Sequence, residues 1–199
     1  MTLTTELEAA TASVRTMFGA AACSCALASD DGGELRFVAA DGAGATEIVG
    51  VTMPIRRGIA GWVALTGQPI AIADVARDDR FARDIAEATE YLPTAVLAAP
   101  LLDEEGETIG VIEVLDPTRL EDETRLGGQR GTSAELAALT AAAAQVSTII
   151  RLSRLASSAT TVAPELVGPL AEIAESGPAG QRLARDVINA VGSYLKAAR

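Results

Sequence analysis

The chain has 199 residues, a formal net charge of −11 and 49% hydrophobic residues, but only 3% aromatic residues. One domain with an appendage fits this length, and its core must be built mainly from Ala, Leu, Val and Ile. Nucleic-acid binders carry a basic face, so the acidic charge argues against direct DNA or RNA binding. Histidine is absent, which removes His-ligated haem, His-containing zinc sites and Ser-His-Asp catalysis.

The two cysteines, Cys23 and Cys25, indicate a reducing compartment. On one strand, side chains two residues apart point the same way but stand roughly 6.5 Å apart, which disfavours a mutual disulfide. We interpret both as small buried core side chains in a cytoplasmic protein. The N-terminus lacks a signal-peptide pattern, and no run of 18 apolar residues predicts a membrane span. Heavy use of Ala and Arg, with Lys196 the single lysine, indicates a bacterial source.

Hydrophobic periodicity and turn residues predict the elements in chain order. The first half is predicted as a helix at 3–18, strands at 21–29, 34–40 and 50–55, a loop at 41–47, a helix at 59–66, a strand at 69–74 and a helix at 78–91. Gly67 and Pro69 end the helix at 59–66, because Gly suits the left-handed position after a helix and Pro cannot continue one.

The second half is predicted as a hairpin of strands at 94–103 and 107–116, a polar loop at 117–131 and a long helix at 132–156. A linker at 156–163 and helices at 164–175 and 178–197 follow, with Pro164 and Pro178 in first-turn positions. The strand at 107–116 is apolar on both sides, so it belongs to a sheet covered on both faces. This order predicts an α+β domain around a mostly antiparallel sheet.

The segment "VTMPIRRGIAGWVALTGQPIAIADVARDDRF", followed by "LAAPLLDEEGETIGVIEVLD", resembles a GAF domain, with the best match over 51–117. The resemblance rests on Gly58-Ile59-Ala60-Gly61-Trp62-Val63, Gly67-Gln68-Pro69-Ile70, Ile72-x-Asp74, Asp79-x-Phe81, Pro100-Leu101 and Gly110-Val111-Ile112 in that order. It implies a GAF-like central antiparallel sheet with the N- and C-terminal helices on one face. On the other face, loops and short helices form a pocket. Residues 1–156 are then the GAF domain, and 157–199 are a C-terminal helical hairpin outside the resemblance.

Arg56 and Arg57 precede the Gly58-x-x-Gly61 turn, which permits two interpretations. A helix N-terminus beside two arginines can hold a phosphate. Alternatively, the glycines allow tight packing and the arginines are solvated, which we favour because no Lys-Ser/Thr follows as in a Walker loop.

Seven residues are predicted to line the pocket: Trp62, Asp74, Arg77, Phe81, Tyr91, Thr94 and Glu113. Trp62 and Phe81 also fit ordinary core positions in so aromatic-poor a chain. Glu113 alternates with apolar residues on one strand face, so its carboxylate either needs a partner or a raised pKa, or lies at the rim.

The resemblance implies a non-catalytic regulatory or sensory module, without metal or cofactor, that binds a small ligand or a protein effector. A ligand-free dimerisation scaffold and a free methionine sulfoxide reductase are the alternatives. The reductases need cysteines near the glycine turn, where this chain has Ile59, Ala60 and Trp62. The Asn-Lys…Phe…Asp-Glu pattern of cyclic-nucleotide-binding relatives is also missing, as is a pocket cysteine of the bilin-binding type.

A parallel homodimer is expected, because the apolar surface of the helix at 132–156 is wider than one stripe. A four-helix bundle on a two-fold axis would cover it. The predicted interface residues are Leu7, Val14, Val146, Ile149, Ile150 and Leu152.

Overall fold

The computed structural model describes residues 2–118 and 130–197 and divides into two compact units, Met1–Arg151 and Leu152–Arg199. The boundary lies five residues before the one expected from sequence. Ile150 is the last fully buried residue of the first unit's core. Of the predicted polar loop, residues 119–129 lie outside the described part of the chain.

The first unit is built on a six-stranded antiparallel sheet with strand order β3-β2-β1-β6-β5-β4. The strands are β1 (Ala22–Ala28), β2 (Glu34–Gly42), β3 (Thr52–Pro54), β4 (Ile70–Ile72), β5 (Val96–Leu102) and β6 (Thr108–Leu115). β6 pairs with β1 on one side and with β5 on the other, so it lies in the middle of the sheet. The α+β class and the antiparallel sheet are therefore confirmed.

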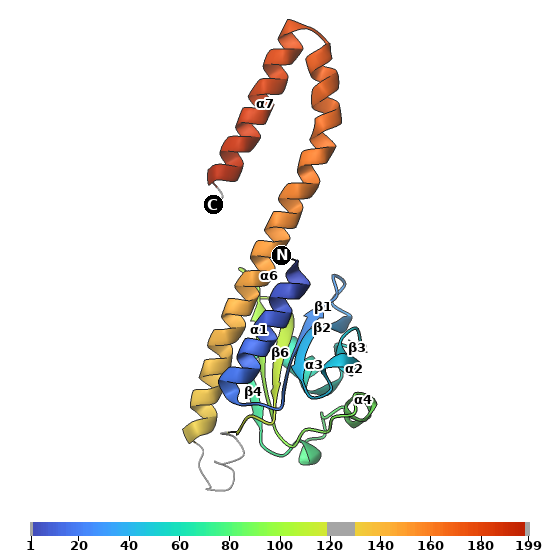
Figure 1. Ribbon diagram of the computed structural model, residues 1–199, viewed down its shortest axis with the longest axis vertical. Helices are drawn as coiled ribbons and strands as arrows, with labels where there is room; N and C mark the ends of the chain where they lie inside the picture. The colour runs from blue at the N-terminus through green and yellow to red at the C-terminus, as the bar shows by residue number, and fades with distance from the viewer. Residues whose placement is uncertain (1, 119–129, 198–199) are drawn as a thin grey trace. The chain divides into compact units, whose positions relative to one another are not determined.

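Helices cover both faces of this sheet (Figure 1). The helices and the 3-10 turn are α1 (Leu3–Phe18), α2 (Ala45–Ile48), α3 (Gly58–Thr66), η1 (Val75–Arg77), α4 (Arg83–Ala88), α6 (Arg130–Glu175) and α7 (Pro178–Ala197). α1 and the first part of α6 lie on one face, while α2, α3 and α4 lie on the other. This is the layering that the sequence predicted.

Local signals explain where α1 and α3 begin and end. The Thr2 side chain accepts a hydrogen bond from the Thr5 backbone N–H at 3.3 Å and caps α1. Gly19 and Gly67 follow α1 and α3 in the left-handed conformation, with φ of 56° and 64°. Each occupies a C-cap position, where glycine adopts a positive φ with less strain than any other residue.

Alternation along the strands produces two cores. On one face, Cys25, Leu97 and Ile112 pack with Leu7 of α1 and Ile150 of α6 to form what we call the helix-side core. On the other face, strand residues pack with α3 to form the cavity-side core, which includes Phe37, Met53, Ile59, Val63, Val96 and Val111. Neighbouring residues of β1, β5 and β6 thus belong to opposite layers.

Two predicted boundaries are wrong. The linker expected at 156–163 is helical, and α6 runs without a break through Pro164, which therefore does not begin a helix. Ala, Ser and Thr tolerate helical geometry, so a composition typical of a linker did not define one. The helix expected at 78–91 is only α4, because residues 78–82 follow η1 in non-helical turns.

The segment Ser133–Arg154 of α6 is long and apolar enough to cross a membrane by length and composition, contrary to the sequence expectation. Leu139, Ala143, Val146 and Ile150 of this segment are nevertheless buried in the helix-side core. The core helix of a folded domain can be equally long and apolar, so these properties are only weak evidence for a membrane span.

The second unit contains the end of α6 and all of α7, joined at Ser176 and Gly177. Gly177 has a φ of 112°, which allows the sharp reversal. A Cβ added at Gly180 would stand 1.8 Å from the Ile173 carbonyl oxygen, so the chain approaches too closely for any other residue there.

Candidate ligand cavity

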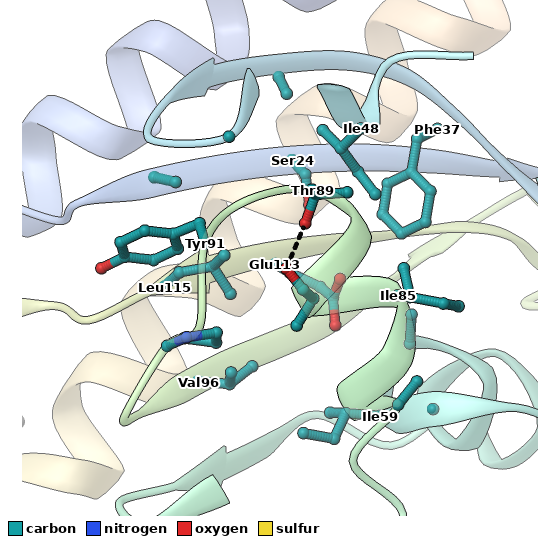
Figure 2. Close-up of a pocket in the computed structure, with 18 of the residues that line it drawn as sticks. Ser24, Phe37, Ile48, Ile59, Ile85, Thr89, Tyr91, Val96, Glu113 and Leu115 are labelled. Carbon is teal, nitrogen blue, oxygen red and sulfur yellow. Dashed lines mark hydrogen bonds between the residues drawn. The ribbon is translucent and has the colours of Figure 1, made fainter. Parts of the chain in front are cut away.

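A cavity of about 100 Å³ lies between the sheet and the short helices of the first unit. Figure 2 shows its lining, with Ser24, Glu113 and Val96 from the sheet and Ile48, Ile59 and Ile85 from α2, α3 and α4. Thr89, Tyr91 and Pro93, from the segment between α4 and β5, line it as well. Most of the lining is aliphatic or aromatic carbon, so a polar group in this space costs free energy unless it finds a hydrogen-bond partner.

Among the described residues that line the cavity, Glu113 is the one with a charged side chain. It lies in the middle of β6, opposite Ser24 of β1 and Ala98 of β5. Within residues 2–118 and 130–197, its carboxylate makes no hydrogen bond or ion pair. Burial raises the pKa of Glu113 from its usual 4.5 to about 7. The Glu113 side chain is half-buried and lines the cavity, so its carboxyl group is available to a molecule in that space.

Ser24 supplies the second polar group. It is 6% exposed, and its position opposite Glu113 in the antiparallel pair puts both side chains on the same face of the sheet. Its hydroxyl forms no hydrogen bond with the part of the chain that the structure describes. Ser24 and Glu113 are thus adjacent polar groups with free hydrogen-bonding capacity, facing the same small space.

The glycine turn at the start of α3 has a packing role. Gly58 has a φ of 74°, and a Cβ at Gly61 would lie 2.3 Å from the Ile55 carbonyl oxygen. Arg57 forms an ion pair with Asp84 of α4 and lowers the pKa of that carboxyl group, while Arg56 is exposed. These contacts favour the packing interpretation of the motif over the phosphate cradle.

Asp116 fastens the segment that carries Thr89, Tyr91 and Pro93. Its Oδ1 accepts hydrogen bonds from the backbone N–H groups of Thr94 and Ala95, both at 2.8 Å, and its Oδ2 accepts one from the Tyr91 hydroxyl. Asp116 has a φ of 49°, a conformation that Asp and Asn tolerate better than most residues. The clamp fixes one wall of the cavity to the end of β6.

We expect Asp116→Ala to lower the free energy of unfolding by about 2 kcal/mol, because it leaves two amides without their acceptor in a strained backbone position. Asp116→Asn keeps an acceptor and tolerates the same φ, so its loss should stay below about 1 kcal/mol. Urea denaturation measures both values. Equal losses for the two variants would contradict the clamp.

The structure brings three of the seven predicted pocket residues into the lining: Phe81, Tyr91 and Glu113. Trp62 instead carries Arg80 over its ring at 4.8 Å, with the Arg80 guanidinium paired with Asp78. The carboxylate of Asp74 caps η1, and Arg77 is exposed. Thr94 is exposed and contributes its backbone N–H to Asp116.

Sequence reasoning missed Ser24, Ile48 and Thr89. The signal for Ser24 was present, because it separates Cys23 and Cys25 and must face the opposite side of the sheet. Ile48 lies in α2, within a region predicted mainly as loop, and Thr89 lies where a longer helix was predicted. Neither position could be assigned to the cavity without the fold.

The cysteines are fully buried free thiols of the helix-side core. Cys23 borders the cavity, but its side chain belongs to the layer on the other side of the sheet. Burial raises the pKa of Cys25 to about 12 and that of Cys23 further still. Both are therefore protonated thiols, the weakly nucleophilic form.

We expect neither thiol to react with Ellman's reagent (DTNB) in the folded protein at pH 8, and both to react after denaturation in guanidinium chloride. The reason is their burial combined with a negligible thiolate fraction. Absorbance at the thionitrobenzoate band gives the count. Rapid modification of one thiol per folded chain would contradict the assignment.

Four of the six predicted dimer residues belong to the domain's own core. Leu7, Val14, Val146 and Ile150 are between 0% and 6% exposed. They pack against the sheet within one chain and are not available to a second copy. Ile149 is half-buried and Leu152 is 62% exposed, so only these two remain as surface candidates.

The first unit is an α+β domain with an antiparallel sheet, terminal helices on one face and a cavity on the other. The GAF-domain model matches residues 2–150, so the chain belongs to the GAF domain family, whose members are typically regulatory or sensory. The GAF domain of a phosphoenolpyruvate-protein phosphotransferase from Coxiella burnetii has a TM-score of 0.64 at 20% identity, over 79% of this chain and 87% of that one.

Two further similarities concern enzymes. A stretch of 59 residues is 42% identical to the dual 3',5'-cyclic-AMP and -GMP phosphodiesterase 11 of Drosophila melanogaster, which is 30% of this chain and 4% of that protein. The chain thus spans a small fraction of that relative. A free methionine-R-sulfoxide reductase from Neisseria meningitidis has a TM-score of 0.59 at 19% identity, over 77% of this chain and 81% of that one. This last likeness concerns the fold.

Proposed function

We propose that this GAF domain is a non-catalytic sensory module whose cavity binds a small ligand and whose helical layer passes the signal to a protein partner. One observation carries the proposal. On the two central strands β1 and β6, a polar residue without a hydrogen-bond partner in the described chain faces the cavity, and the residues before and after it face the helices. Ser24 lies between Cys23 and Cys25, and Glu113 lies between Ile112 and Val114.

This arrangement supports a route for coupling. A ligand that draws on Ser24 and Glu113 acts on the backbone of β1 and β6. The alternate residues of those strands pack against α1 and α6 in a close-packed core. Packed layers transmit small displacements because they do not deform freely. The proposal excludes catalysis at the cysteines, since their side chains lie in the other layer and are protonated.

Native mass spectrometry of the freshly purified full chain tests ligand binding. We expect an added small-molecule mass on the wild type and on Ala88→Phe, but not on Ala82→Phe. Ala82 lines the cavity, whereas Ala88 is exposed in the same region and serves as the matched control. The bare protein mass for all three, with no stabilisation by a fragment library, would instead identify a ligand-free scaffold.

The output surface is proposed to be a homodimer seam that includes Ile149 and Leu152, three residues apart on α6 and hence on neighbouring positions of its surface. Leu152 is a large apolar side chain that is mostly exposed in one chain. A second copy, related by a two-fold axis, would cover it.

We expect a dimeric mass at tens of micromolar by light scattering and a monomeric mass for Leu152→Arg, because a buried unpaired charge costs several kcal/mol. Thr140→Arg is the control, since Thr140 is exposed on a different side of the same helix. A monomeric wild type, or a dimer that survives Leu152→Arg, would end this part of the proposal.

A further inference from the structure

We propose that the cavity selects a small organic ammonium ion and that Glu113 is the residue that recognises it. The inference rests on the proposed function and specifies the chemistry of its ligand. It depends on the size of the space, on the signs of the charges around it and on the hydrogen-bonding groups that its walls leave free.

Size limits the ligand first. The cavity has a volume of about 100 Å³. An engineered apolar cavity of roughly 150 Å³ accommodates benzene, whereas pockets for drug-sized ligands occupy roughly 300–1,000 Å³. The cavity therefore fits a molecule of a few non-hydrogen atoms. A whole nucleotide exceeds this space.

Charge limits the ligand next. Glu113 has the only charged side chain in the described lining, and no Arg or Lys lines the cavity. Arg57, which lies beside the cavity at the start of α3, is already paired with Asp84. A phosphate or carboxylate ligand would thus meet a like charge without compensation. A cation supplies the partner that the protein itself does not.

Hydrogen bonding distinguishes a cation from a neutral ligand. The Glu113 carboxylate offers two acceptor oxygens, and the Ser24 hydroxyl beside it can accept as well. The Thr89 hydroxyl already donates to the Ala86 carbonyl oxygen at 3.1 Å. The Tyr91 hydroxyl donates to Asp116. The free polar groups form an acceptor-rich corner, which matches the three donors of an ammonium group, while the aliphatic walls match its carbon skeleton (Figure 2).

Among the titratable groups of the described lining, Glu113 is the one whose charge changes between pH 6 and 8.5. Across the lining, the other titratable groups are the Tyr91 hydroxyl, which is held by Asp116, and the Cys23 thiol, which lies on the opposite face of β1 and stays protonated. Ammonium binding requires the carboxylate form. An alkylamine, like lysine, keeps its proton throughout pH 6–8.5. Affinity should therefore increase with pH across the Glu113 titration.

Three probes of matched shape test the inference on the full chain: isobutylamine, isobutanol and isobutyrate. Dissociation constants are measured by NMR titration at pH 6.0 and 8.5 for wild type, Glu113→Gln and Ala82→Phe. We expect isobutylamine to bind most tightly and to gain about tenfold in affinity between these pH values, following the ionised fraction of a group with a pKa near 7. Glu113→Gln should lose the preference for the amine and the pH dependence, and Ala82→Phe should lose all binding.

Two results would overturn the inference in distinguishable ways. Tighter binding of isobutanol or isobutyrate, abolished by Ala82→Phe, would reject the ammonium ligand but keep the cavity as a binding site. No binding of any probe, together with the bare protein mass, would reject both the ligand class and the proposed function. A Glu113→Gln variant that fails to fold would be replaced by Glu113→Asp, which keeps the charge but withdraws it, and should weaken amine binding while retaining its pH dependence.

Discussion

Glu113→Gln is expected to be more stable than the wild type by about 3 kcal/mol above pH 8, and by only about 1 kcal/mol at pH 5. In the folded protein, burial raises the pKa of Glu113 from 4.5 to about 7. Between these values the folded state holds a proton that the unfolded state has released. The wild type therefore loses stability as the pH rises from about 4.5 to about 7, and the loss is complete above 7. Glutamine is neutral throughout and avoids it.

Urea denaturation at pH 5, 7 and 8.5 measures this difference. Glu107→Gln provides the control, because Glu107 is exposed in the turn between β5 and β6 and its substitution should leave the difference near zero. A Glu113→Gln curve parallel to the wild type at all three pH values would mean that the carboxyl group is solvated. In that case the cavity would offer a ligand no unpaired charge.

Gly61→Ala should lower the free energy of unfolding by about 3 kcal/mol, because overpacking against fixed backbone costs more than contact with a movable side chain. The added Cβ would lie 2.3 Å from the Ile55 carbonyl oxygen and 3.1 Å from the Ile55 carbonyl carbon. Either the Ile55 peptide or the first turn of α3 must shift. Since Ile59 and Ala60 of that turn line the cavity, ligand binding should weaken as well.

Gly33→Ala is the matched control, since its Cβ would approach no atom closer than 3.4 Å and its φ is not positive. We expect a change below about 0.5 kcal/mol for this variant, as for most surface substitutions. Guanidinium denaturation of both proteins gives the comparison. A neutral Gly61→Ala would show that the close approach is not needed, and it would reopen the phosphate-cradle interpretation of the motif.

The strands of the sheet could be predicted because their signals are local, whereas the placing of the helices on its two faces came from the resemblance to GAF domains. The apolar residues on both sides of the strand at 107–116 predicted a sheet covered on both faces, and in the structure Ile112 and Val114 face one core and Val111 the other. The end of α3 was readable from Gly67 for the same reason. Helix continuity through Pro164 was not readable, because residues compatible with both helix and linker carry little information.

The cavity itself was only partly predictable. Glu113 could be placed on it because a carboxylate within an apolar strand is unusual in any sheet. Ser24 could have been placed on the face opposite the two cysteines, but its position beside Glu113 needed the pairing of β1 with β6, and Ile48 needed the position of α2. Trp62 packs against the cavity-side core, as the alternative interpretation expected, and its ring supports Arg80. Leu7, Val14, Val146 and Ile150 lie in the domain's own core, because the pattern that fits a partner helix also fits the sheet.

The central claim is that an occupant of the cavity acts on the helical layer through β1 and β6. Amide chemical shifts of the ¹⁵N-labelled full chain on addition of isobutylamine at pH 8.5 test it directly. The account predicts shifts at Ser24 and Glu113 and at residues around Val14 of α1 and Val146 of α6. It predicts none of these shifts in Ala82→Phe, and weaker shifts at the same isobutylamine concentration in Glu113→Gln. Shifts confined to the protein surface, or the same shifts in Glu113→Gln, would contradict it.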